Sequence, residues 1–143
     1  AHNIIPLLSR FNNLIVITNS AKSAFLLGNM GIQNICTGGR MITQSLCYIG
    51  EDAERTVSNY NADVLFFSCR GVSAQGYMTD PAVEEANLRK VMFQYSKQKV
   101  LLCDSSKFDQ TYFYNIGHIS TIDQIISEAP LPEHIRQLMP EKR

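Results

Sequence analysis

Residues 64–69 read VLFFSC, an almost unbroken apolar run that ends at Arg70 and Gly71. A second run, VLLC at residues 100–103, also ends in polar residues, here DSSK. Short apolar runs bounded by turn residues are typical of strands in a sheet that is covered on both faces. The two runs therefore predict central strands of an α/β fold.

Helical and strand patterns alternate on both sides of these two runs. Strands are predicted at residues 14–17, 33–37 and 119–126, helices at 4–11, 21–29, 51–60, 81–97, 108–115 and 133–139, and a loop at 71–78. Residues 41–49 are ambiguous between the two patterns. Strands separated by helices of this length predict a mostly parallel sheet with helices on both faces and right-handed crossovers.

The composition indicates a folded domain without a nucleic-acid-binding surface. The chain has 143 residues, 45% of them hydrophobic, which is enough for one compact domain with a sizeable core. The formal net charge is zero, whereas DNA- and RNA-binding domains usually carry a basic stripe that contacts phosphates. Charged residues make up only 18% of the chain, which favours burial of some surface in a homo-oligomer. No apolar run reaches the roughly 18 residues of a membrane span.

The four cysteines are too far apart in the sequence for a local metal or redox motif. Cys36, Cys47, Cys69 and Cys103 form no CxxC pair, and three of them lie in apolar runs. Buried free thiols are the ordinary interpretation, and free thiols indicate the reducing cytoplasm. We therefore expect no metal and no cofactor.

Glycine and small polar residues follow each central strand. Ligands of open α/β sheets bind beyond the carboxyl ends of the strands, where glycines admit backbone amides and helix N-termini attract anions. Lys107 and Arg70 can supply countercharge, and Asn19 and Ser105 can bind hydroxyls. Turns contain the same residue types for backbone reasons alone, so each cluster by itself is better explained as a turn. Four clusters at one edge favour a site for an oxygen-rich anion.

Several segments, in order, resemble the sensor domain of the DeoR family of bacterial transcriptional repressors. They are VITNS at 16–20, TGGRM at 37–41, YIGEDAE at 48–54, FFSCRGVSAQGYMTDPAVEEANLRKVM at 66–92, LCDSSKF at 102–108 and the ending STIDQIISE at 120–128. The Asp-Ser-Ser-Lys-Phe motif at 104–108 is the most diagnostic of them. The resemblance covers residues 4–128, nearly the whole chain.

The resemblance implies a fold, a ligand class and a partner. The fold is that of ribose-5-phosphate isomerase and the CoA transferases, and the effector is a phosphorylated sugar or a related metabolite. A separate N-terminal winged helix-turn-helix holds operator DNA. The family's ligand-cleft positions fall on Asn19, Gly38, Gly39, Gly71, Gly76, Thr79, Glu85 and Lys107. Lys107 would be the countercharge, and Glu85 and Asn19 the hydroxyl partners.

This chain departs from the family pattern in three respects. The family's Asp-Ser-Gly-Thr-Thr loop, which cradles the phosphate, does not occur here, and neither does the DNA-binding region. We expect residues 1–143 to be the effector-sensing part of a longer protein whose helix-turn-helix and first strand lie upstream. Arg70 stands where an acidic or small residue is common, which bears on the identity of the sugar.

Two alternatives to a sensor remain open at this point. The first is a sugar-phosphate isomerase or related enzyme on the same fold, since fold alone does not separate the two. An isomerase needs a positioned carboxylate base, and the strand at 64–69 ends in Arg70 and Gly71 rather than in paired acids. The second is an oligomerisation module with a vestigial cleft, which would form a stable dimer or tetramer without responding to a ligand.

Overall fold

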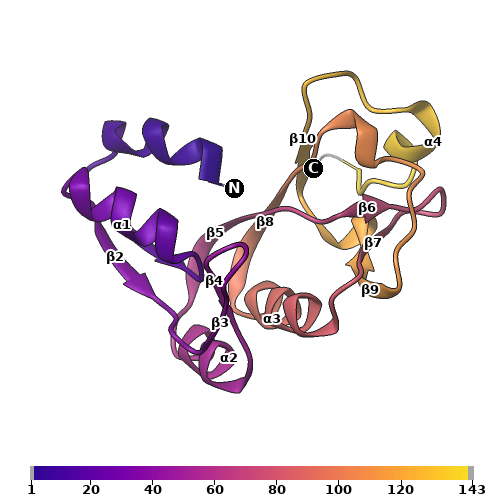
Figure 1. Ribbon diagram of the computed structural model, residues 1–143. Coiled ribbons are helices and arrows are strands. Elements are labelled where there is room, and N and C mark those ends of the chain that lie inside the picture. The colour runs from indigo at the N-terminus through magenta and orange to yellow at the C-terminus, as the bar shows by residue number, and fades with distance from the viewer. Residues whose placement is uncertain (1, 142–143) are drawn as a thin grey trace. The chain divides into compact units, whose positions relative to one another are not determined.

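The computed structural model describes residues 2–141, with the side chains of residues 2 and 3 left out. The chain divides into two compact units, Ala1–Tyr60 and Asn61–Arg143, coloured from indigo to magenta and from magenta to yellow in Figure 1. No helix in the described part of the chain has the length and apolar character needed to cross a membrane.

The first unit combines a parallel pair of strands, a hairpin and three helices. Its elements are the 3₁₀-helix η1 (His2–Arg10), β1 (Ile15–Thr18), α1 (Ala21–Asn29), β2 (Gln33–Cys36), β3 (Arg40–Ile42), β4 (Cys47–Ile49) and α2 (Glu51–Ser58). Strands β1 and β2 are parallel, with α1 connecting them, and β3 and β4 form an antiparallel hairpin. Helix η1 lies beside α1 (Figure 1). The strands and helix predicted at 14–17, 21–29 and 33–37 are confirmed, and the ambiguous segment 41–49 forms most of the hairpin.

Helix α1 begins at the N-cap that the sequence predicts. Ser20 has extended backbone angles (φ −98°, ψ 117°), and its side chain accepts a hydrogen bond of 3.0 Å from the Ser23 amide. We expect Ser20→Ala to lower the free energy of unfolding by about 1 kcal/mol, because that amide loses its acceptor. Urea unfolding followed by circular dichroism measures the change. Ser45→Ala, at an exposed turn position of the same unit, is the control, and equal effects of the two variants would contradict the capping role.

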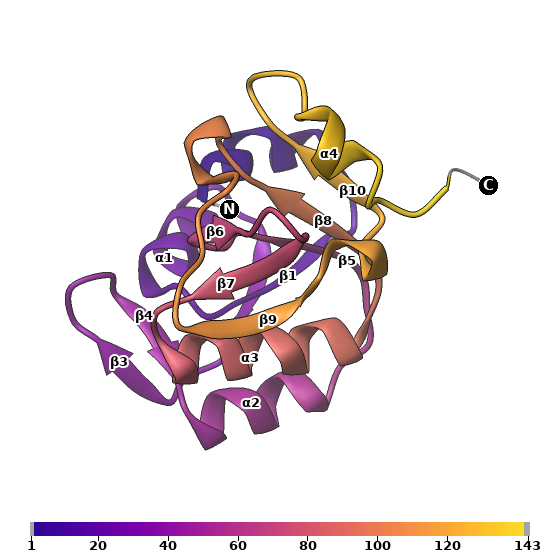
Figure 2. The ribbon, with the colours of Figure 1, turned by 90° about the vertical axis from the view of Figure 1, so that its right-hand side faces the viewer.

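The second unit contains a three-stranded parallel sheet and a small antiparallel sheet. The parallel sheet has β8 (Ser96–Leu102) between β5 (Ala62–Phe67) and β10 (Gln124–Ile126), and the antiparallel sheet consists of β6 (Gly71–Val72), β7 (Tyr77–Asp80) and β9 (Tyr114–His118). The helices are α3 (Val83–Gln94), η2 (Ser105–Lys107), η3 (Ile119–Thr121) and α4 (Glu133–Arg136). Figure 2 shows β6, β7 and β9 side by side, with α3 along β9.

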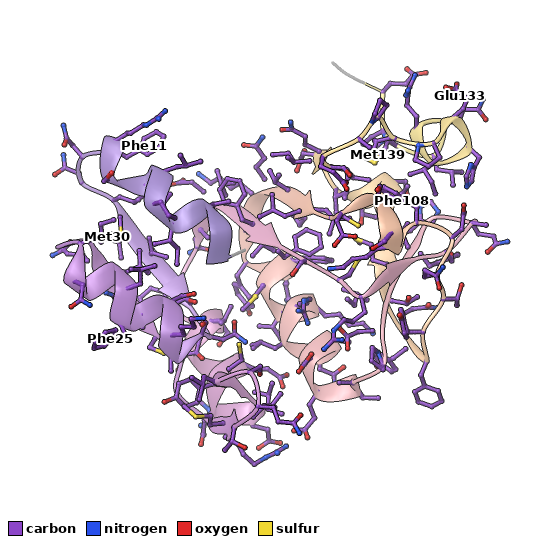
Figure 3. All side chains as sticks on the ribbon, turned by 45° about the horizontal axis from the view of Figure 1, so that its top comes forward. Phe11, Phe25, Met30, Phe108, Glu133 and Met139 are labelled. Carbon is purple, nitrogen blue, oxygen red and sulfur yellow. The ribbon has the colours of Figure 1, made fainter. Side chains whose placement is uncertain are left out.

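A single hydrophobic core joins both sheets of the second unit. Leu101 of β8, Met78 of β7 and Ile135 of α4 are all fully buried in it. The rings of Phe67 and Phe93 meet edge to face, with centroids 4.7 Å apart. In Figure 3, Phe108 and Met139 are labelled close together in this unit, and Met139 packs against the core. The core therefore ties the loop after β8 and the C-terminal helix to the sheet.

The structure corrects the predicted architecture in three places. The sheet is not mostly parallel, because half of the strands lie in antiparallel sheets: segment 71–78, predicted as a loop, contributes to the β6–β7 hairpin. Segment 108–115, predicted as a helix, is not helical: Phe108 bridges Val72, Asp109 lies in a turn with a positive φ of 62°, and the segment ends in β9. The prediction that helices cover both faces fails at β5, where Val64 and Phe66 are 40% and 38% exposed.

Helix boundaries differ less from the prediction. Helix α3 begins at Val83 rather than Pro81, because Asp80 belongs to β7 and its Oδ1 accepts a hydrogen bond from the Ala82 amide. It ends at Gln94, three residues before the predicted end, where β8 begins at Ser96. The strand predicted at 119–126 is limited to β10, preceded by η3.

Candidate functional site

In the first unit, the predicted site residues follow the two parallel strands. Thr18 of β1 lies opposite Cys36 of β2, so Asn19 and the pair Gly38–Gly39 lie at the same edge of this sheet. The Asn19 side-chain amide donates a hydrogen bond of 3.0 Å to the Tyr48 carbonyl, and the Tyr48 amide donates one of 2.7 Å to the Asn19 carbonyl. Asn19 thus fastens the β3–β4 hairpin to the end of β1, and its role as a hydroxyl partner stays a prediction.

The backbone of the turn after β2 explains its two glycines. Gly38 and Gly39 have positive φ angles of 63° and 111°. A Cβ atom on Gly39 would lie 2.7 Å from the Ile49 carbonyl oxygen, closer than a side chain tolerates. The Thr37 hydroxyl is buried and donates to the Gly38 carbonyl over 3.0 Å. Turn geometry accounts for both glycines here, and contact of their amides with a ligand stays a prediction.

In the second unit, two cationic side chains follow neighbouring parallel strands. Arg70 comes after β5 and Lys107 after β8, and these strands pair directly. Arg70 is exposed, and its backbone amide donates to the Thr79 carbonyl over 3.1 Å. The Lys107 side chain is 29% exposed, with its Nζ 3.9 Å from Asp104 Oδ2. The carboxyl edge of this sheet therefore carries two positive charges, and their role as countercharges to a ligand stays a prediction.

The loop that carries Lys107 is stabilised by carboxylates of the chain itself. The Ser106 hydroxyl donates to Asp104 Oδ1 and, with Lys107, holds the pKa of that carboxyl below its usual value. Glu128 accepts hydrogen bonds of 2.7 and 3.1 Å from the amide and hydroxyl of Ser105. Bonds from Ser127 and from Ser105 likewise lower the pKa of Glu128. The loop thus presents donors that bind carboxylate oxygens.

Three further predicted site residues, Thr79, Gly71 and Gly76, are closely packed against other parts of the chain. Thr79 is completely buried, and its hydroxyl donates to the Gly71 carbonyl over 3.1 Å and accepts from the Tyr112 amide over 3.0 Å. A Cβ on Gly71 would lie 2.5 Å from the Gln110 carbonyl oxygen. Gly76 (φ 91°) forms the hairpin turn, and a Cβ there would lie 2.8 Å from His118 Nε2. These contacts hold the loops in place whether or not a ligand is bound.

Glu85 lies in the first turn of α3 and is half-buried. In the described part of the chain, no hydrogen bond or ion pair joins it to Arg70 or Lys107, so the structure does not bring these three together directly. Asp80, near the start of α3, is 1% exposed, and its Oδ2 lies 3.7 Å from an Arg89 side-chain nitrogen. The sequence does not predict Asp80 as a site residue. The sequence indicates only a helix cap at this position, whereas the structure places Asp80 at the end of β7.

The groups at this edge are suited to binding an anion. Arg70 and Lys107 can hold an anion through charge and hydrogen bonds. The amides of loop 105–107 already donate within the chain, to Glu128 Oε1, Asp104 Oδ1 and the Asp104 carbonyl. Within residues 2–141, no three His, Cys, Asp or Glu side chains gather as a metal site. The acids that flank Lys107, Asp104 and Glu128, are both engaged by hydroxyl donors rather than positioned as free bases.

Comparison with known proteins points to one class. The chain is 35% identical over 131 residues to the uncharacterized HTH-type transcriptional regulator YulB of Bacillus subtilis, covering 90% of this chain and 51% of YulB. It is 30% identical to the L-fucose operon activator of Escherichia coli, covering 81% of this chain and 48% of that protein. It is 25% identical to the glycerol-3-phosphate regulon repressor of E. coli, covering 90% and 51%.

The chain thus spans about half the length of the curated relatives it matches. The family model described as the DeoR C-terminal sensor domain matches residues 1–129, which is most of the chain. The chain therefore belongs to the DeoR family of transcriptional regulators, as a C-terminal sensor domain.

Proposed function

We propose that this sensor domain binds a phosphorylated sugar or a related metabolite at the carboxyl edge of its parallel strands. The observation that carries the proposal is the placement of Arg70 and Lys107 after the directly paired strands β5 and β8. The names of two relatives, one for L-fucose and one for glycerol 3-phosphate, support a sugar-related and phosphorylated ligand. Lys107 supplies countercharge, and Glu85, in the same unit, binds hydroxyl groups of the ligand.

In this proposal, the domain works as a cytoplasmic sensor and does no chemistry. The effector biases a two-state homo-oligomer, which alters operator binding by a separate N-terminal winged helix-turn-helix. The domain, in this proposal, has the fold of ribose-5-phosphate isomerase and the CoA transferases. The relatives that support this role are transcriptional regulators, and the two acids at this edge, Asp104 and Glu128, are engaged by serine donors of the chain itself.

Thermal unfolding with a panel of ligands tests the proposal. The panel pairs phosphorylated sugars and glycerol 3-phosphate with their unphosphorylated counterparts. A ligand at about 100 times its dissociation constant stabilises a protein by roughly 2.7 kcal/mol, which is a shift of several degrees for a domain of this size. We expect one phosphorylated compound to raise the Tm and Lys107→Ala to abolish that rise, because the phosphate loses its countercharge.

Lys97→Ala is the matched control for Lys107→Ala. Lys97 lies at the opposite end of β8, and its Nζ is also 3.9 Å from an aspartate, Asp63. The Lys97 variant should keep the full ligand-dependent rise in Tm. Equal loss in both variants would show a general charge effect, and no rise with any phosphorylated compound would contradict ligand binding by this chain.

A further inference from the structure

Two buried cysteines lie opposite one another at the carboxyl edge of the parallel sheet. Phe67 of β5 is the register partner of Leu101 of β8, and Cys69 and Cys103 each follow two residues later. The equal offset places both thiols on the same face, and both belong to the same core, with exposures of 2% and 4%. Neighbouring strands are about 4.8 Å apart, which is within the roughly 4.4–6.8 Å between Cα atoms that disulfides span.

The two thiols interact with each other and with Lys107. A hydrogen bond from the Cys69 thiol, together with the charge of Lys107, lowers the pKa of Cys103, although burial opposes it. The same hydrogen bond and burial raise the pKa of Cys69. When both are protonated, the sulfurs have the Gly71 and Asp104 carbonyl oxygens as acceptors, each 3.5 Å away. Once Cys103 ionises, the Cys69 thiol donates its hydrogen bond to the Cys103 thiolate instead.

The other two cysteines lack this arrangement. Cys36 is in β2, which pairs with β1, and Cys47 is in β4, which pairs with β3. They are therefore not register partners, and both are only partly buried. Cys69 and Cys103 are the cysteines whose strands place them face to face.

We propose that Cys69 and Cys103 form a reversible disulfide when the protein meets hydrogen peroxide, so that this dithiol is a modification site. The Cys103 thiolate attacks one peroxide oxygen, an S–O bond forms and the O–O bond breaks, which leaves a sulfenic acid and, after protonation, water. Cys69 gives up its proton and attacks the Cys103 sulfur, so the S–S bond forms and a second water leaves. Two thiols and one peroxide become one disulfide and two waters.

The disulfide changes the edge that carries Arg70 and Lys107. It ties the residue before Arg70 to the residue before Asp104, which restrains both loops. It also consumes the Cys103 thiol, so that no negative charge can form on this sulfur next to Lys107. This consequence rests on the proposed function, whereas formation of the disulfide does not.

Tryptic mapping tests the disulfide without any variant, because each cysteine falls in its own peptide. Cleavage after Lys and Arg places Cys69 in peptide 56–70 and Cys103 in peptide 100–107, with Cys36 in 23–40 and Cys47 in 41–55. The folded chain is treated with peroxide, free thiols are alkylated, and the digest is analysed by mass spectrometry. We expect peptides 56–70 and 100–107 to be linked and to separate on treatment with dithiothreitol.

The variants sharpen the result. The double variant Cys36→Ser/Cys47→Ser should form the same link, and Cys69→Ser should leave Cys103 as a higher oxide without a link. Recovery of peptides 56–70 and 100–107 as alkylated thiols from peroxide-treated folded protein would overturn the proposal, and so would linkage only after unfolding in urea. Since no ligand enters this experiment, its failure is independent of the sugar-phosphate proposal.

Discussion

Replacing Thr79 by valine is expected to lower the free energy of unfolding of the second unit by about 2–3 kcal/mol. Valine matches the shape of threonine but removes the hydroxyl that bridges the Gly71 carbonyl and the Tyr112 amide. The Tyr112 amide loses its acceptor, and the Gly71 carbonyl loses a hydroxyl donor. An unsatisfied buried polar group costs roughly 1–3 kcal/mol. Urea unfolding followed by circular dichroism measures the change.

Thr79→Ser separates the hydroxyl from the methyl group. Serine retains both hydrogen bonds and loses one methyl, for a cost of about 1 kcal/mol. The serine variant should also keep the ligand-dependent rise in Tm, because the hydroxyl still orders the loop. If Thr79→Val proved no more destabilising than Thr79→Ser, the two hydrogen bonds of the Thr79 hydroxyl would contribute nothing to stability. A direct role of this hydroxyl in ligand binding would then gain support.

Replacing Gly71 by alanine is the second change with a large expected effect. The added Cβ would lie 2.5 Å from the Gln110 carbonyl oxygen and 3.0 Å from the Tyr112 ring. The nearest obstacle is backbone, which yields only if strand β6 or the loop at 110–112 moves. Overpacking a buried site typically costs about 1–3 kcal/mol and occasionally more, and we expect a loss near 3 kcal/mol. Chemical denaturation of the purified chain measures it.

Gly117→Ala in β9 is the matched control for Gly71→Ala. Its Cβ would meet Met78 Cε and Phe93 Cε2 at 3.7 Å, which is ordinary van der Waals contact. The two variants carry the same chemical change in the same unit, so their difference isolates the close approach at Gly71. Comparable stability of the two would contradict the crowding inferred there.

Part of the candidate site could be predicted because the carboxyl ends of parallel strands share one edge. That rule places Arg70 and Lys107 together once the runs at 64–69 and 100–103 are identified as strands, and the structure confirms that those strands pair. The engagement of Ser105 by Glu128 and the burial of Thr79 depend on partners 23 and 33 residues away. Local patterns contain no information on such contacts, so both became visible only in three dimensions.

The cysteines are a second case in which the sequence and the tertiary structure give different information. Spacing in the sequence, with no CxxC pair, predicts four unrelated buried thiols. Strand register decides instead that Cys69 faces Cys103, because each lies two residues beyond a pair of register partners. A spacing of 34 positions in the chain thus becomes adjacency in space, which local sequence rules do not detect.

By itself, the sequence determined the elements whose causes are local. Ser20 caps α1, apolar runs make β5 and β8, and the ordered motifs identify the family, because capping, burial and motif spacing involve neighbouring residues. Only the tertiary structure decided the antiparallel sheet of β6, β7 and β9, the open face of β5 and the contacts of Thr79. These depend on which distant segments pair and on which surfaces remain uncovered, and both are properties of the assembled chain.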